Sequence, residues 1–139
     1  DLDPGTIMAL EESDEILYLV GLNVGALRAA AAGLAAFQSL GIDRSEVKVV
    51  LARTDAREEV SPGQAQEALG VPIFWRIPND YRTVVSSINR GTPLVLSSPR
   101  TEVARNLQKL GETLVREPAP RDDGKDRSFS LLRHIWTSG

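Results

Sequence analysis

Short apolar runs alternate along the chain with stretches of helical spacing. Three runs have the length of a strand, at residues 15–20, 47–51 and 71–77. Between the first two, residues 25–40 are rich in alanine and place apolar side chains at intervals of three and four. Strand-length runs that alternate with helices predict βαβ units with right-handed crossovers. Because the runs are mostly apolar, we expect an open, mostly parallel α/β sheet with helices on both faces.

Helix boundaries are marked by turn and capping residues. Ser61-Pro62-Gly63-Gln64 has the form of a capping box, with proline at the first helical position. Asn79 or Asp80 is suited to cap the next helix, and Asn23 to cap the helix after the first run. Glycine ends three predicted helices. These glycines are Gly41, Gly70 and Gly91.

Two further helices follow the third apolar run. One shares an apolar face among Tyr81, Val84, Val85 and Ile88. The other is predicted to begin at Ser98-Pro99, and the type of the short run at 93–96 stays open. Its apolar face comprises Val103, Leu107, Leu110 and Leu114.

Ligands of open parallel sheets bind beyond the carboxyl ends of the strands. In this chain those ends fall at residues 21–25, 52–55 and 78–81. These three loops are therefore the candidate places for a ligand. The acidic residues just before the first run are better explained as a solvated turn than as paired catalytic carboxylates. They are Glu11, Glu12, Asp14 and Glu15.

Composition narrows the chemistry. The 139 residues suffice for one domain, and a formal net charge of −3 gives no basic field, so nucleic-acid binding is not expected. The absence of cysteine excludes disulfides, thiolate zinc sites and cysteine nucleophiles. A single histidine, His134, disfavours histidine-based metal sites and Ser-His catalysis. No segment has the ~18 consecutive apolar residues of a membrane span.

The C-terminal region differs in composition from the rest. Charges, prolines and a glycine make residues 117–127 a predicted linker. In residues 128–139, Phe129, Leu132 and Trp136 recur at helix-like spacing, as in a short amphipathic tail. Peripheral membrane contact is one role for such a tail. Its two to three turns favour folding back onto the domain or docking on a partner.

The order of these pieces resembles that of the MinD/ParA-like P-loop ATPases. The likeness runs over about residues 3–114. It is carried by five motifs in family order: Ser13-Asp14-Glu15-Ile16-Leu17, Val49-Val50-Leu51-Ala52-Arg53, Glu67-Ala68-Leu69-Gly70-Val71-Pro72, Ile77-Pro78-Asn79-Asp80 and Ser87-Ile88-Asn89-Arg90-Gly91-Thr92-Pro93-Leu94. The resemblance implies that residues 1–116 are the C-terminal half of a P-loop NTPase-like domain.

Residues 79–94 and 98–114 look most like the CpaE/TadZ subgroup, which is associated with assembly and polar placement of pili. This resemblance implies ATP and Mg²⁺ as cofactors of the intact protein and a nucleotide-dependent homodimer. It also implies pilus-assembly or polarity proteins as partners. The implied location is the cytoplasm, with possible peripheral placement at the inner membrane or at a cell pole.

The sequence departs from the family pattern in three places. It has no Gly-Lys-Ser/Thr loop, so this piece alone is expected to bind neither ATP nor Mg²⁺ and to hold no catalytic residue. The resemblance also implies that the metal-binding aspartate lies before Asp1, because Asp1 is too close to Asp14 to occupy its place. Ala52 replaces the asparagine that reads the adenine edge in the family, and a methyl group neither donates nor accepts a hydrogen bond.

By the same resemblance, the adenine side of the site would be formed by Arg53, Pro78, Asn79 and Asp80. A structural explanation of the same residues is also available. A strand end and a helix cap account for residues 78–80, and Arg53 is equally well explained as a solvated side chain.

Two functional hypotheses follow for the intact protein. In the first, it is an ATP-dependent positioning or assembly factor that switches between monomer and dimer. In the second, the fold survives as a non-hydrolysing scaffold, with Ala52 as a sign of decay. A receiver-like module is disfavoured, because strand-end aspartates are missing. We also expect a sheet edge, exposed by the missing half, that is either covered by that half or self-associates.

Overall fold

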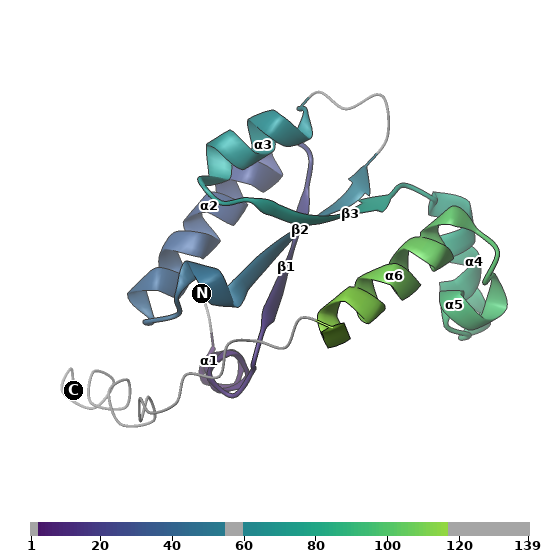
Figure 1. Cartoon of the computed structure of the whole chain (residues 1–139), viewed down its shortest axis with the longest axis horizontal. Coiled ribbons are helices and arrows are strands. Elements are labelled where there is room, and N and C mark those ends of the chain that lie inside the picture. Colours follow the sequence, from purple (N-terminus) through teal and green to yellow (C-terminus); the bar gives the residue numbers. More distant parts are fainter. Residues whose placement is uncertain (1–2, 55–59, 117–139) are drawn as a thin grey trace.

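The computed structural model describes residues 3–54 and 60–116 (Figure 1). The elements follow one another along the chain as helices that alternate with three strands. They are α1 (Pro4–Glu11), β1 (Ile16–Gly21), α2 (Val24–Ser39), η1 (Arg44–Glu46), β2 (Val47–Thr54), α3 (Pro62–Leu69), β3 (Ile73–Pro78), α4 (Tyr81–Arg90), α5 (Leu94–Ser97) and α6 (Glu102–Arg116).

The described strands form one parallel sheet in the order β1-β2-β3. Ile16 pairs with Val47, and Val50 pairs with Trp75. Helices α2 and α3 connect consecutive strands and pack side by side on one face of the sheet (Figure 1). The predicted open α/β sheet of βαβ units is confirmed.

The main core lies between the sheet and the α2–α3 layer. Alternate residues of β2, Val49 and Leu51, are fully buried there. Leu34 and Phe37 of α2 and Leu69 of α3 pack over them. Burial of such a side chain stabilises the fold by about 1.5–3 kcal/mol relative to exposure. The apolar residues of the strand runs and those at helical spacing therefore pack together in one core.

Helix α6 covers the opposite face where it meets β3. The Trp75 indole nitrogen donates a hydrogen bond to Asn106 Oδ1 at 2.9 Å. The Asn106 amide nitrogen in turn donates to the Arg76 carbonyl oxygen at 3.0 Å. Val103 and Ala104 of α6 are buried on this side. One asparagine therefore joins the helix to both a side chain and the backbone of β3.

The same face of β1 is uncovered in the part of the chain that the structure describes. Leu17 and Leu19 are 37% and 59% exposed. The partner strand of β1 is β2, so its other side is an edge of the described sheet. Helices therefore contact both faces of the described sheet, but the face of β1 opposite α2 is uncovered. The expected exposed edge is present at β1.

Several predicted boundaries are confirmed. Ser61 accepts a hydrogen bond from the Gln64 N–H, and Gln64 reaches back to the Ser61 N–H, which completes the capping box. Gly70 and Gly91 end α3 and α4 in the left-handed region, with φ of 65° and 62°. Glycine suits these positions because a Cβ atom disfavours positive φ.

Other boundaries differ from the sequence prediction. Helix α6 begins at Glu102 and not at Ser98-Pro99, because the Thr101 hydroxyl and carbonyl take up the first helical N–H groups. Residues 94–97 form the short helix α5. Helix α1 was not predicted, although its capping signal is present in the sequence. The Asp3 carboxylate accepts from the Thr6 N–H and hydroxyl, which lowers the Asp3 pKa.

Candidate functional site

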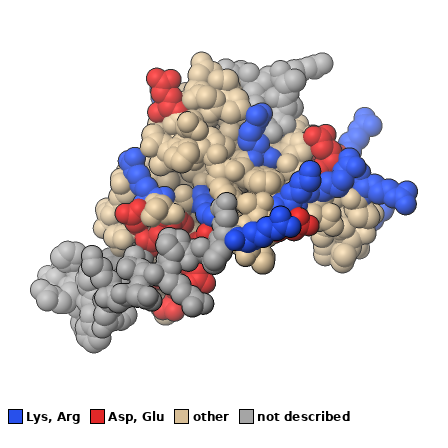
Figure 2. Space-filling model, viewed as in Figure 1, with Lys and Arg blue, Asp and Glu red and all other residues tan. Residues whose placement is uncertain are grey.

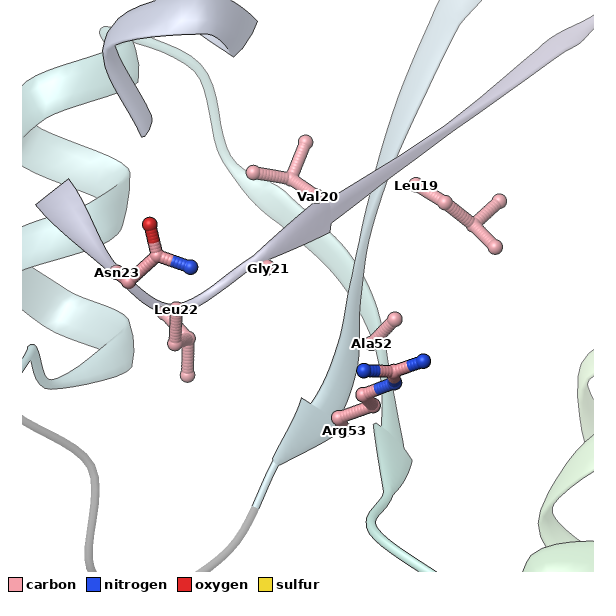
Figure 3. A pocket seen from close by; sticks show the side chains of 7 residues that line it. All are labelled: Leu19, Val20, Gly21, Leu22, Asn23, Ala52 and Arg53. Carbon is pink, nitrogen blue, oxygen red and sulfur yellow. The ribbon is translucent and has the colours of Figure 1, made fainter. Parts of the chain in front are cut away.

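A hollow of about 390 Å³ lies at the carboxyl ends of β1 and β2 (Figure 3). It brings together two of the three strand-end loops that the sequence predicted, those after the first and second apolar runs. Its lining comprises Leu19, Val20, Gly21, Leu22, Asn23, Ala52 and Arg53.

The β1 side of the hollow is fixed by the start of α2. Leu22 is buried under the loop. Asn23 caps α2, because its Oδ1 accepts a hydrogen bond from the Ala26 N–H at 2.8 Å. The capping role predicted for Asn23 is confirmed. A capped helix start directly after a strand holds this wall of the hollow in one conformation.

The β2 side is shaped by a backbone irregularity at Arg53. Within residues 3–54 and 60–116, Arg53 is the one non-glycine residue with positive φ, at 60°. The pairing of β2 with β3 shifts register between Leu51 and Thr54. A left-handed conformation costs an L-residue about 1–2 kcal/mol. Such irregularities redirect side chains beside binding sites. Here the irregularity places Ala52 and the Arg53 guanidinium along the hollow (Figure 3).

The lining defines which chemistry the hollow accommodates. The exposed Leu19 offers apolar contact, and Arg53 offers the one charged group of the lining. The half-buried Ala52 presents only a methyl group to the hollow. The lining contains no carboxylate. This combination suits a flat, partly apolar group whose polar edge meets backbone groups and a guanidinium.

The other three predicted site residues lie at the end of β3 or directly after it, and they do not line this hollow. Pro78 is half-buried and pairs with Thr54 in the ladder, so it lies beside the end of β2. Asn79 is exposed. Asp80 caps α4 by accepting from the Thr83 N–H at 3.1 Å. Hydrogen bonds from the Thr83 hydroxyl and N–H lower the Asp80 pKa below its ordinary 3.8.

The capping explanation is thus confirmed for Asp80. A nucleotide-contacting role for Arg53, Pro78, Asn79 and Asp80 stays a prediction. The register at Thr54 and Pro78 does place the end of β3 next to the end of β2. The three predicted loops therefore follow neighbouring strands at one edge of the sheet, and two of them share the hollow.

Residues 3–54 and 60–116 contain neither a candidate metal site nor a candidate membrane span. Among residues 3–54 and 60–116, no three acidic or histidine side chains gather closely enough to hold a metal ion. In that part of the chain, none of the helices has the length and apolar character required to cross a bilayer. The 139 residues contain no Gly-Lys-Ser/Thr loop beside this hollow.

Known proteins share the sequence pattern and the fold of this chain. No family model matches the chain. A protein described as the septum site-determining protein MinD of Nephroselmis olivacea is 28% identical over 98% of this chain and 51% of its own length. A ParA family ATPase from Chlorobium tepidum superposes with a TM-score of 0.76 at 21% identity, over 82% of this chain and 48% of that one.

A third match agrees. The MinC:MinD cell division complex of Aquifex aeolicus matches with a TM-score of 0.72 at 22% identity, covering 86% of this chain and 50% of the matched chain. This chain has the MinD/ParA-like P-loop ATPase fold. It spans about half the length of these proteins. The sequence similarity to MinD supports membership of the MinD/ParA-like superfamily. The structural similarity to MinD and ParA covers more than four fifths of this chain, and not only the hollow.

Proposed function

We propose that this chain forms the adenine side of an ATP site in a MinD/ParA-like ATPase. The observation that carries the proposal is the hollow at the ends of β1 and β2, with Arg53 held in a left-handed conformation beside it. Ligands of this class of sheet bind at that edge. Arg53 approaches the base or ribose, and Pro78 with Asn79 forms the neighbouring wall.

Ala52 makes this half of the site weaker than an asparagine would. A side-chain amide at this position offers both a donor and an acceptor to a base edge, and the methyl group offers neither. Recognition of the base then relies on backbone groups at the strand ends and on Arg53. One net hydrogen bond contributes about 0.5–1.5 kcal/mol, so the loss of the amide weakens ATP binding without abolishing it.

The phosphates and Mg²⁺ require residues that these 139 positions do not contain. A backbone cradle and a lysine supply phosphate binding in P-loop proteins. In the proposed protein, bound ATP supplies the γ-phosphate whose presence or loss distinguishes the two states of the switch. The residues of this chain bind and orient the adenosine end.

Substitution at Ala52 and Arg53 tests the nucleotide site in the longest natural chain that contains these residues. Ala52→Asn is expected to tighten ATP binding about tenfold, which corresponds to about 1.4 kcal/mol. Arg53→Ala is expected to weaken it by a similar factor. Arg28→Ala, an exposed arginine on α2, serves as the control. Equal ATP affinities for wild type, Ala52→Asn and Arg53→Ala would contradict the proposal.

At the level of the whole protein, we infer a nucleotide-dependent homodimer that positions other proteins in the cytoplasm, at the inner membrane or at a cell pole. Support comes from the MinD/ParA-like fold. A role in pilus assembly is the narrower proposal, and it rests on the CpaE/TadZ-like character of residues 79–94 and 98–114. A deletion strain that assembles and places pili normally would argue against that narrower role.

A second candidate is a non-hydrolysing scaffold with the same fold. Ala52 favours it, because loss of the adenine-reading amide is what relaxed selection on ATP binding would allow. Measurement of the protein's self-association with and without ATP distinguishes the switch from the scaffold. Association that requires ATP supports the switch, whereas association that is indifferent to ATP supports the scaffold.

A further inference from the structure

Helix α4 presents apolar side chains to solvent on one face, and none of its residues is buried. Tyr81 and Ile88 are 70% and 71% exposed, and Val84 on the same face is also exposed. Thr83 and Ser87 are half-buried instead. Ser87 Oγ donates a hydrogen bond to the Thr92 carbonyl oxygen at 2.6 Å, which fixes this side against the turn after the helix.

This orientation is the reverse of an ordinary surface helix. Amphipathic helices normally bury their apolar stripe against the core. The sequence places Tyr81, Val84 and Ile88 on one face, which a reader of the sequence alone assigns to the core. The structure leaves that face uncovered in the part of the chain that it describes. Contiguous apolar side chains on a surface mark an interaction site.

The apolar stripe borders a shallow, open depression along α4, with arginines at its rim. A concavity of about 370 Å³ runs along α4, with Val85 at its apolar side and Asn89 and the guanidinium groups of Arg82 and Arg90 around it. Neither arginine has an ion pair with another described residue. The depression is suited to an apolar anchor side chain that has a carboxylate nearby.

The surface around Arg82 and Arg90 is also positively charged. Residues 76–116 contain seven arginines and lysines but three aspartates and glutamates, while the whole chain has a net charge of −3. Figure 2 shows lysine and arginine side chains gathered over the α4–α6 end of the molecule. An anionic partner is therefore attracted to this end and not to the chain as a whole.

We propose that the outward face of α4 docks an amphipathic helix of another protein, with acidic residues flanking its apolar stripe. Helix-in-groove recognition uses anchors at intervals of three, four and seven residues, which is the spacing of Tyr81, Val84 and Ile88. The acidic flanks pair with Arg82 and Arg90. This docking does not depend on the proposed nucleotide site.

Other occupants fit the surface less well. A second copy that pairs by two-fold symmetry places Arg82 and Arg90 against arginines of the same kind. Nucleic acid satisfies the arginines but leaves Ile88 and Tyr81 in water. A bilayer meets a flat surface with a broad apolar face, whereas α4 offers three exposed large side chains beside a concavity.

Binding of two designed helical peptides to the full chain tests the proposal. Both peptides carry the same leucine stripe, flanked by glutamates in one and by lysines in the other. Fluorescence anisotropy is expected to show at least about tenfold tighter binding of the glutamate peptide. Ile88→Asp is expected to weaken that binding at least tenfold. Arg82→Glu with Arg90→Glu is expected to reverse the preference.

Matched substitutions control for general effects. Val115→Asp changes an equally exposed apolar residue on α6, and Arg28→Glu reverses an exposed charge on α2. Both are expected to bind the glutamate peptide as wild type does. Because all substituted side chains are exposed, circular dichroism should show an unchanged fold.

Other outcomes overturn the proposal. Equal binding of the two peptides excludes the charge match, and full binding by Ile88→Asp excludes the stripe. In another outcome, the wild-type chain binds phosphatidylglycerol vesicles or duplex DNA and neither peptide. If Ile88→Asp or the double arginine variant abolishes that binding, the surface is assigned to the lipid or the DNA. Self-association that Ile88→Asp abolishes assigns it to a second copy.

Discussion

Arg53 shows how one residue links the local backbone to the site. Its positive φ and the register shift beside it turn the end of β2 toward the hollow. Sequence reasoning singled out Arg53 by resemblance, but its left-handed backbone has no sequence signal, since glycine or asparagine is the usual choice there. The left-handed conformation of Arg53 therefore lowers the stability of the fold, and it is a reason to look for a functional role at this residue.

Replacement of Arg53 by glycine separates stability from binding. Arg53→Gly is expected to raise the free energy of unfolding by roughly 0.5–1 kcal/mol, because glycine adopts positive φ freely. Arg53→Ala retains the restriction and is expected to leave stability nearly unchanged. Urea unfolding followed by circular dichroism measures both. A loss of stability in Arg53→Gly would show that the side chain itself supports the fold.

Gly33 in α2 provides a second residue-scale prediction. A Cβ atom at this position overlaps the Tyr18 hydroxyl. The Tyr18 ring is held edge-on against Phe37, with ring centroids 5.3 Å apart. Gly33→Ala is therefore expected to destabilise the fold by about 1–3 kcal/mol, although alanine is the better helix former.

The control for Gly33 is another helical glycine with free space around it. Gly111 on α6 has no atom within 4 Å of an added Cβ. Gly111→Ala is expected to stabilise the fold by about 1 kcal/mol through helix propensity. Thermal unfolding compares the two. Stabilisation by Gly33→Ala as large as by Gly111→Ala would refute the packing of Tyr18 over α2.

At the scale of elements, β2 and α2 were predictable because burial and periodicity agree. The fully buried Val49 and Leu51 fall in an apolar run, and Leu34 and Phe37 keep helical spacing. Glycines and capping residues fixed the helix ends. What escaped prediction depends on tertiary contacts. The outward face of α4 looks like a core face in the sequence, because periodicity reports amphipathicity and not which side is covered.

Asn106 provides the element-scale prediction, since it joins α6 to β3. Asn106→Ala leaves the half-buried Trp75 indole N–H without its acceptor. A lost hydrogen bond of this kind is expected to cost about 1–2 kcal/mol. Hydrogen exchange should show faster opening of α6 than of α2. Gln108→Ala, an exposed substitution on the same helix, should behave as wild type. Equal exchange of α6 in both variants would rule out this anchoring role.

At the scale of the whole molecule, the described sheet has an unprotected edge and a bare apolar strip on β1. Leu17 and Leu19 lie in water on the face that α6 does not reach. Exposed strands of this kind pair with other chains. The proposed nucleotide site is also incomplete by itself, because the 139 residues contain no Gly-Lys-Ser/Thr loop.

Self-association of the 139-residue chain follows from this edge. Sedimentation velocity at rising concentration is expected to show dimers or larger species. Leu19→Lys is expected to shift the equilibrium toward monomer by about tenfold or more, because a charged edge residue disfavours pairing. Val115→Lys on α6 is the control. A stable, well-folded monomer at all concentrations would contradict the prediction.

The central claim is that the ends of β1, β2 and β3 form the adenine side of an ATP site. Photoaffinity labelling with 8-azido-ATP tests it most directly, in the longest natural chain that contains these residues. The account predicts label that ATP competes away, located by mass spectrometry at residues 52–54 or 77–80. Competed label confined to other parts of the chain, or no competed label at all, would contradict the account.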